Sequence, residues 1–438
     1  MIGEYIPLII LLLVVLAILS GIPVAFALGG IPLWFGLFIF GEKFLGQFTM
    51  LTYGIMTDYS FTAVPLFILM GALLERSGMA DNLYKSFYYL FGPLNGGLAI
   101  ATVLMATLFG ACTGIVAAGV VTIGLLAMPA MLSRGYSKEI AAGSICVGGG
   151  LGVIIPPSIM LILYGSVGGV SISDLFAGGI VPGLLFSLFY VVYIAVRCSL
   201  NPALGPALSR EARSEISGRE LFFMTIKSLI PPLALILVVL GSIFFGIVAP
   251  SEAAALGSVG AALIAAFAGK LTWKAVQESV LFTLKTTTMV MFIVLGGKFF
   301  MVLVLSTGAA ELVENLILSL PLGTTGSLFI MMFIVFVLGC LVDWIGLLFI
   351  IVPILTPIIE KLGIDPLYFG ILFCATLQIA NMTPPLAFSA FFLKGICPPE
   401  VTIGDIYRGC VPFILLQMIV ILILILFPKV VLYLPSIM

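Results

Sequence analysis

Long apolar runs, separated by short polar or glycine- and proline-containing stretches, follow one another along the whole chain. A helix needs about 20 consecutive apolar residues to cross the hydrocarbon core of a bilayer. The runs cover about 6–20, 23–40, 50–76, 98–131, 139–165 and 173–197, then 222–245, 250–268, 273–305, 326–360, 366–393 and 405–433. Of the 438 residues, 62% are hydrophobic and 8% charged, whereas a soluble domain has about 25% charged residues. The pattern predicts an all-α polytopic membrane protein.

The second half of the chain repeats the first. A shift of 228 residues (340 − 112) aligns six scarce residues in one register, which is difficult to attribute to chance. The sequence therefore predicts two homologous halves, 1–209 and 223–438, joined by a linker at 210–222. The aligned pairs are Cys112 and Cys340, Pro129 and Pro357, Gly135 and Gly363, Cys146 and Cys374, Pro156 and Pro384, and Pro157 and Pro385.

The densest polar stretch of the sequence, residues 197–223, divides the two halves. It contains Arg197, Arg210, Arg213 and Arg219, and loops rich in basic residues remain on the cytoplasmic side of a membrane. We therefore expect a cytoplasmic linker and two periplasmic termini. The alternative is an exposed surface helix on the opposite face.

Two apolar runs, 98–131 and 326–360, are long enough for two short helices that enter the membrane and return. Gly110–Gly114 and Gly339–Asp343 would form the tips of these re-entrant hairpins. Each half then has about five crossings, and odd-numbered halves must insert in opposite orientations. Inverted repeats of this kind are typical of secondary transporters. If both legs of each run cross the membrane instead, the halves are parallel.

The segments 139–165 and 366–393 cannot be continuous helices. Four glycines between 148 and 152 weaken the first, and Pro156-Pro157 interrupts it, while the second is interrupted at Asn381–Pro385. Unwound backbone within a membrane is tolerated where it lines a cavity, and its free carbonyl groups bind cations such as Na⁺. A matched pair of broken helices therefore predicts a binding site.

Ionisable residues inside apolar runs are functional candidates, because burying a charge in lipid is costly. Asp343, at the second tip, could bind Na⁺ or a proton, or could be a solvent-facing helix cap. Lys298 could meet an anionic substrate, although snorkelling to the interface or an ion pair is the simpler interpretation. The net charge is −1, which gives no support to a nucleic-acid partner. There is no histidine, so the commonest metal ligand is absent from the sequence.

Five stretches of the sequence together form a recognisable family pattern. They are PLFILMGALLERSG at 65–78, GACTGIVAAGVVTIGLLAMPAMLSRGY from 110, GGGLGVIIPPSIMLILYG at 148–165, GIVAPSEAAALG at 246–257 and GCLVDWIGLLFIIVPILTPIIEKLGIDPLYFG from 339. These stretches resemble the large membrane subunit of the tripartite ATP-independent periplasmic (TRAP) transporters. The resemblance implies an elevator-type ion transporter in the inner membrane of a bacterium. It also implies Na⁺-driven import of small organic acids, a periplasmic substrate-binding protein and a small four-helix membrane subunit.

The hairpin tips and helix breaks together predict two pseudo-symmetric Na⁺ sites and a substrate site. Relative to the family pattern, Ile115 replaces a hydroxyl residue and Ala380 replaces a glycine, so the first Na⁺ site should be the weaker one. The predicted ligands are Gly110, Thr113, Gly148, Gly152 and Pro156 for the first site, and Gly339, Asp343, Thr376, Asn381 and Thr383 for the second. The predicted substrate-binding residues are Ser158, Pro157, Pro384 and Lys298.

Three other functions are alternatives to a TRAP permease. A stand-alone Na⁺/dicarboxylate symporter of the same architecture is the main alternative, and it would need no binding protein. A membrane enzyme would need a convergent set of acids, bases or nucleophiles, and the spans contain no histidine or paired aspartates. A structural scaffold would not need two matched broken helices.

Overall fold

The computed structural model describes residues 2–114, 116–209, 216–319 and 321–438. These residues form α-helices joined by short turns and by the 3₁₀ turns η1 (Tyr59–Thr62), η2 (Leu151–Val153) and η3 (Pro202–Leu204). The first half contains α1 (Ile2–Leu19), α2 (Val24–Phe40), α3 (Lys43–Thr57), α4 (Ala63–Arg76), α5 (Met79–Phe91), α6 (Gly97–Thr113), α7 (Val116–Ser133), α8 (Lys138–Gly150), α9 (Ile159–Gly168) and α10 (Ile172–Leu200). The second contains α12 (Gly218–Phe244), α13 (Pro250–Phe267), α14 (Trp273–Ser306), α15 (Ala309–Leu318), α16 (Gly323–Gly339), α17 (Trp344–Lys361), α18 (Pro366–Ala380), α19 (Phe388–Lys394), α20 (Ile403–Leu426) and α21 (Lys429–Ser436).

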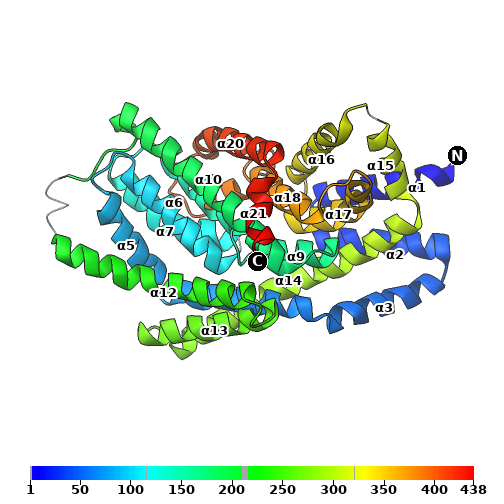
Figure 1. Cartoon of the computed structure of the whole chain (residues 1–438), viewed down its shortest axis with the longest axis horizontal. Helices are drawn as coiled ribbons and strands as arrows, with labels where there is room; N and C mark the ends of the chain where they lie inside the picture. Colours follow the sequence, from blue (N-terminus) through cyan, green and yellow to red (C-terminus); the bar gives the residue numbers. More distant parts are fainter. Residues whose placement is uncertain (1, 115, 210–215, 320) are drawn as a thin grey trace.

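The order of helices in the first half recurs in the second (Figure 1). Each half begins with two helices, α1–α2 or α12–α13. The 34-residue helix α14 then corresponds to α3, η1 and α4, which together cover the equal stretch 43–76. A short helix (α5 or α15), a helix pair (α6–α7 or α16–α17), an interrupted helix (α8–α9 or α18–α19) and a long helix (α10 or α20) follow in both halves.

Two of the segments expected from the sequence differ from the observed helices. The run at 50–76 begins earlier, at Lys43, and is interrupted because the Asp58 carboxylate accepts a hydrogen bond from the Ser60 amide at 2.9 Å. The run at 405–433 is divided: α20 ends at Leu426 and α21 begins after Pro428. Proline has no backbone N–H and cannot continue the α20 hydrogen-bond ladder.

The described part of the chain contains eight helices that are long and apolar enough to cross a membrane. They include α10, α12, α13, α14 and α20, but also α7 and α17, which are the second legs of the two helix pairs. The prediction of an all-α polytopic membrane protein is confirmed.

Five helices, α2, α4, α12, α13 and α14, form a layer that we call the frame. Helix α4 packs on α13 and α14, and α14 packs on α2. The Ser258 hydroxyl donates to the Leu66 carbonyl at 2.7 Å, which ties α13 to α4. Gly29 and Gly296 allow α2 and α14 to approach closely: a Cβ at Gly296 would lie 3.0 Å from the Gly29 nitrogen. Small residues are the usual means of packing helices closely in lipid.

The helices α6–α10 and α16–α20 form a second group that we call the core. Helix α8 packs against α6, α7 and α20, and α18 packs against α10, α16 and α20. Gly149 faces α7 so closely that a Cβ there would lie 2.7 Å from the Val120 nitrogen. The glycines that weaken α8 therefore also allow the first helix pair to lie against it.

Candidate functional site

The connection between α6 and α7 lies against the interruption between α8 and α9. A Cβ at Gly110 would lie 2.9 Å from the Gly152 nitrogen, and one at Gly152 would lie 3.2 Å from the Gly110 carbonyl oxygen. Gly114, at φ +60°, closes α6, and a Cβ there would lie 3.2 Å from the Pro157 carbonyl oxygen. We call this backbone contact the first junction.

The second half forms an equivalent contact between the end of α16 and the end of α18. A Cβ at Gly339 would lie 2.7 Å from the Ala380 Cβ. The Leu386 amide, in the interruption between α18 and α19, donates to the Cys340 carbonyl at 3.4 Å. We call this contact the second junction.

Each junction brings together the C-terminal ends of two helices. Helices α6 and α8 end at the first junction, and α16 and α18 end at the second. The last turn of a helix has carbonyl groups without intrahelical donors, and the helix dipole makes that end negative. Two such ends in contact favour a bound cation with oxygen ligands. Helices α7 and α9 begin beside the first junction, and α17 begins beside the second. Because the helix dipole makes the start of a helix positive, these starts favour anions.

Asp343 begins α17, and its carboxylate accepts a hydrogen bond from the Ile345 amide at 3.2 Å. This bond uses one oxygen as a helix cap, so the cap interpretation and the ligand interpretation are compatible. The side chain also lines a cavity. Thr383 donates its hydroxyl hydrogen to the Ile379 carbonyl at 2.9 Å, which leaves oxygen lone pairs available.

The second interruption contains buried polar atoms without a hydrogen-bond partner in the described residues. They are the Nδ2 of Asn381 and the Oγ of Ser389, and both residues are almost completely buried. Ala387 between them has φ +37°, a left-handed conformation that L-residues rarely adopt. Strained backbone and unsatisfied polar groups together are typical of a functional site.

A cavity of about 540 Å³ lies beside the junctions, between the starts of α7, α9 and α17 on one side and α1, α2 and α14 on the other. Such a volume lies within the range of about 300–1,000 Å³ that is usual for ligand pockets. The lining is mostly apolar, with polar groups at Thr286, Asp343, Trp344 and Asn381. The core side is formed by Val116, Ala117, Ile159, Asp343, Trp344, Ile345, Asn381, Leu386, Phe388 and Phe392, and the other side by Ile18, the 21–25 turn, Thr286, Met289, Val290 and Ile293.

Several residues predicted as ligands lie elsewhere. Thr376 donates to the Leu372 carbonyl at 2.8 Å and lines an apolar groove beside Met332, away from the cavity. Lys298 lies over the ring of Phe61, 5.6 Å from its centroid, and does not line the cavity. Gly148 packs on Ala106.

The remaining predicted residues divide between the two junctions. Pro156, Pro157 and Ser158 are buried at the first, where the Ser158 hydroxyl donates to the Val153 carbonyl. Pro384 is exposed at the second. The Thr113 side chain and Ile115 lie outside the part of the chain that the structure describes.

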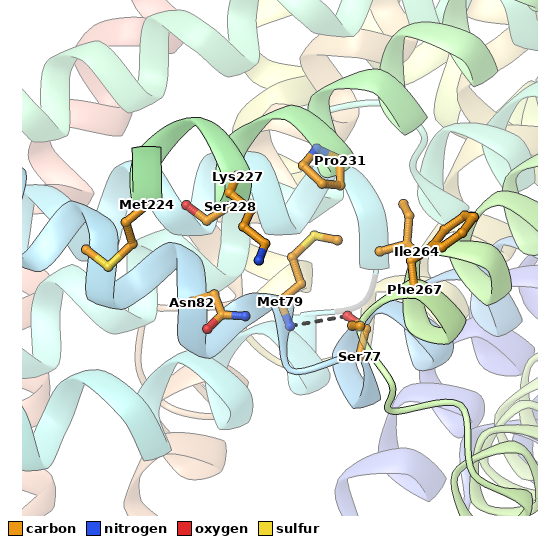
Figure 2. A pocket seen from close by; sticks show the side chains of 10 residues that line it. Ser77, Met79, Asn82, Met224, Lys227, Ser228, Pro231, Ile264 and Phe267 are labelled. Carbon is orange, nitrogen blue, oxygen red and sulfur yellow. Dashed lines mark hydrogen bonds between the residues drawn. The ribbon is translucent and has the colours of Figure 1, made fainter. Parts of the chain in front are cut away.

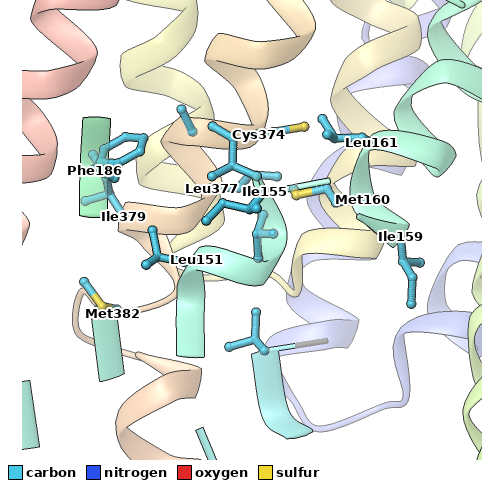
Figure 3. Close-up of a cluster of buried hydrophobic side chains, with 14 of the residues drawn as sticks. Leu151, Ile155, Ile159, Met160, Leu161, Phe186, Cys374, Leu377, Ile379 and Met382 are labelled. Carbon is cyan, nitrogen blue, oxygen red and sulfur yellow. The ribbon is translucent and has the colours of Figure 1, made fainter. Parts of the chain in front are cut away.

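A buried polar cluster near the interruptions was missed in the sequence. The Nε2 atoms of Gln378 and Gln417 both lie within hydrogen-bond distance of the Tyr190 hydroxyl, and both amide oxygens lack partners among the described residues. The signal in the sequence was a glutamine inside an apolar run, at Gln378 and again at Gln417. Figure 3 shows the apolar packing near the interruptions, where Ile155 of the first interruption lies beside Leu377 of α18.

The matched junctions, the cavity between core and frame and the apolar exterior define a polytopic membrane transporter. The family model of the tripartite ATP-independent periplasmic transporters, DctM component, matches residues 9–430. The chain therefore belongs to the DctM family, the large permease subunits of TRAP transporters, as the sequence motifs indicated. It is a transporter permease and not an enzyme.

Curated relatives cover most of the chain. The C4-dicarboxylate TRAP transporter large permease protein DctM of Vibrio cholerae is 29% identical over 98% of this chain and 97% of its own length. The ectoine TRAP transporter large permease protein TeaC of Halomonas elongata is 30% identical over 89% of this chain and 90% of its own. The isethionate TRAP transporter permease protein DctMQ of Oleidesulfovibrio alaskensis is 29% identical over 93% of this chain and 63% of its own.

A solved structure shares the fold. The YdaH transporter of Alcanivorax borkumensis superposes with a TM-score of 0.60, covers 89% of this chain and 88% of its own, and is 15% identical in sequence. At that identity the likeness concerns the fold alone.

Proposed function

We propose that this permease imports a small organic acid or related solute across the bacterial inner membrane, driven by a Na⁺ gradient. The observation that carries the proposal is the close contact at each junction, where Gly110 meets the backbone of Gly152 and Gly339 meets the side chain of Ala380. Both contacts join two negative helix ends, and Na⁺ is a hard cation that prefers oxygen ligands. Asp343 adds a carboxylate at the second junction, which should bind Na⁺ more tightly.

The solute would bind in the 540 Å³ cavity, between the junctions and the frame. Asp343 is the ionisable side chain in its described lining. An anionic solute would therefore depend on bound Na⁺ and on the starts of α7, α9 and α17 for charge compensation. Asn381 supplies an amide that can donate to a solute oxygen. This arrangement links solute binding to ion binding.

We further propose that the two halves are inverted repeats and that the core moves against the frame as an elevator. The repeated element order and the two equivalent junctions support this proposal. With inverted halves, both termini are periplasmic and the arginine-rich linker is cytoplasmic. TRAP membership also indicates a small membrane subunit and a periplasmic binding protein that delivers the solute.

Uptake by proteoliposomes tests the function. The complete system, with the small subunit and the loaded binding protein, should accumulate solute when a Na⁺ gradient is imposed, and the permease alone should transport little. Robust uptake by the permease alone would favour a stand-alone symporter. Equal uptake in Na⁺-free buffer under a proton gradient would contradict coupling to Na⁺.

A further inference from the structure

A second cavity, of about 480 Å³, opens between α5, α12 and the end of α13 (Figure 2). Its lining combines polar groups from Ser77, Asn82, Lys227 and Ser228 with the apolar side chains of Met79, Met224, Pro231, Ile264 and Phe267. It is distinct from the cavity at the junctions, which shares none of these residues.

A lysine side chain extends into this cavity. In Figure 2 the ammonium group of Lys227 leaves α12 and points toward Asn82 and Met79 of α5. The ion pairs of the described residues are Arg76–Glu278, Lys274–Glu278 and Lys361–Glu314, so Lys227 has no acidic partner in that part of the chain. The cavity therefore presents an uncompensated positive charge.

Two oppositely charged side chains lie close to Gly78, which is between the lining residues Ser77 and Met79. The Lys270 side chain comes within 3.9 Å of the position that a Cβ of Gly78 would occupy, and an Asp81 carboxylate oxygen lies 4.0 Å from the same position. No ion pair joins Lys270 and Asp81 among the described residues, but their opposite charges cancel in the local sum, which leaves the region positive by the charge of Lys227.

The cavity lies at the depth of the lipid headgroups. Lys227 is the last ionisable residue of α12, and residues 228–244 that follow it span about 25 Å at 1.5 Å per residue, close to the hydrocarbon thickness of about 30 Å. At the same end of the molecule, Phe267 is 89% and Trp273 81% exposed. Exposed aromatic residues beside lysines mark the boundary between headgroups and acyl chains.

We propose that this cavity binds the headgroup of an anionic phospholipid. Lys227 would pair with the phosphate, and Asn82 would donate a hydrogen bond to it. The exposed apolar surface of Ile264 and Phe267 would lie along an acyl chain. Basic pockets between membrane helices on the cytoplasmic side are suited to such lipids. Bound there, the lipid would brace α5 against the frame where Ser86 and Ser228 already form a hydrogen bond of 2.8 Å.

Native mass spectrometry of the purified full-length permease tests this proposal. The protein in detergent is titrated with phosphatidylglycerol, with zwitterionic phosphatidylethanolamine and with inorganic phosphate. One lysine near an anionic headgroup should favour phosphatidylglycerol over phosphatidylethanolamine about fivefold. Lys227→Gln should abolish that preference and Lys227→Arg should preserve it. Lys274→Gln, which removes the same charge at the same end but outside the cavity, should also preserve it.

Asn82→Ala provides a second variant should Lys227→Gln fail to fold. It should weaken phosphatidylglycerol binding because the amide would donate to the phosphate, and unchanged binding in this variant would overturn the proposal. Equal binding of the two lipids by the wild-type protein would overturn the proposal, as would an unchanged preference in Lys227→Gln. Displacement of phosphatidylglycerol by inorganic phosphate would assign the cavity to a free anion. Exclusion of lipid whenever the small subunit is copurified would assign it to a protein contact. Either of these two results would overturn the lipid assignment.

Discussion

Replacing Gly339 by alanine places a methyl group where Ala380 already projects its own. The new Cβ would lie 2.7 Å from the Ala380 Cβ, about 0.7 Å closer than the 3.4 Å at which ordinary contact begins. Overpacking of this kind costs about 1–3 kcal/mol. If the strain falls on the ion-bound state, in which the second junction must close, it raises the half-saturating Na⁺ concentration about 5- to 150-fold.

Removing the opposing methyl group should reverse the effect. Ala380→Gly alone introduces no clash and costs about 1 kcal/mol in helix propensity. In the double variant Gly339→Ala/Ala380→Gly the new Cβ still lies 2.9 Å from Cδ2 of Leu377, but this is the flexible end of a side chain and can move aside. The double variant should therefore bring the Na⁺ requirement back to within about threefold of wild type, with a coupling energy in the range of about 0.5–3 kcal/mol seen for contacting residues. Gly110→Ala should show the same defect without a matching rescue, because its Cβ would meet backbone atoms of Gly152.

The assay is solute uptake by the complete reconstituted system against Na⁺ concentration at a fixed membrane potential. Thermal unfolding of each purified variant is followed in parallel. Gly241→Ala is the matched control, since a Cβ there would meet nothing within 4 Å. An unchanged Na⁺ curve in Gly339→Ala would refute the junction argument. So would a double variant no better than Gly339→Ala alone.

Three further predictions concern single residues and topology. Asp343→Ala should abolish Na⁺-dependent uptake and Asp343→Asn should raise the half-saturating Na⁺ concentration; an unchanged Na⁺ curve in Asp343→Ala would remove the residue from the site. Thr376→Val should leave the Na⁺ curve within about twofold of wild type, because the hydroxyl bonds within its own helix beside an apolar groove, and a large shift would restore the residue as a ligand. Alkaline phosphatase and fluorescent-protein fusions at residues 1, 210 and 438 should report periplasmic termini and a cytoplasmic linker, and a cytoplasmic C-terminus would contradict inverted repeats.

The helix interruptions were predictable because their causes are local. Proline removes a backbone donor and clashes with the preceding turn wherever the chain is placed, so Pro156 and Pro384 mark their breaks in the sequence itself. The same is true of the turn between α6 and α7, where glycine permits the φ of +60° observed at Gly114. The broken stretch at Asp58 was missed, since a single aspartate cap among apolar residues gives a weak signal.

The cavity lining was not predictable, because it depends on how distant segments pack. Thr286 and the 21–25 turn face Asp343 across the cavity although they are far from it in sequence. Thr376, a predicted ligand of the second Na⁺ site, shows the same dependence on packing. Thr376 precedes Asn381 by five residues, which is about 7.5 Å along a helix and is not a whole number of its 3.6-residue turns. The two side chains therefore point in different directions, and the Thr376 hydroxyl lies at the apolar groove. Sequence spacing gives the depth of a residue along its helix, while the packing of that helix decides which side chains meet.

The two junctions share one backbone arrangement but differ in how they are covered. Pro157 lies in a narrow crevice with Met70 of α4 and Leu235 and Val239 of α12, whereas Pro384 and Pro385 are exposed. Since both interruptions carry the same proline pair, the difference arises from the position of the core against the frame rather than from the breaks. An elevator movement would exchange the two environments: the frame would release the first proline pair as it covered the second. The proposed ion sites would then remain intact throughout, because the contacts that would build them, Gly110 with Gly152 and Gly339 with Ala380, are formed within the core.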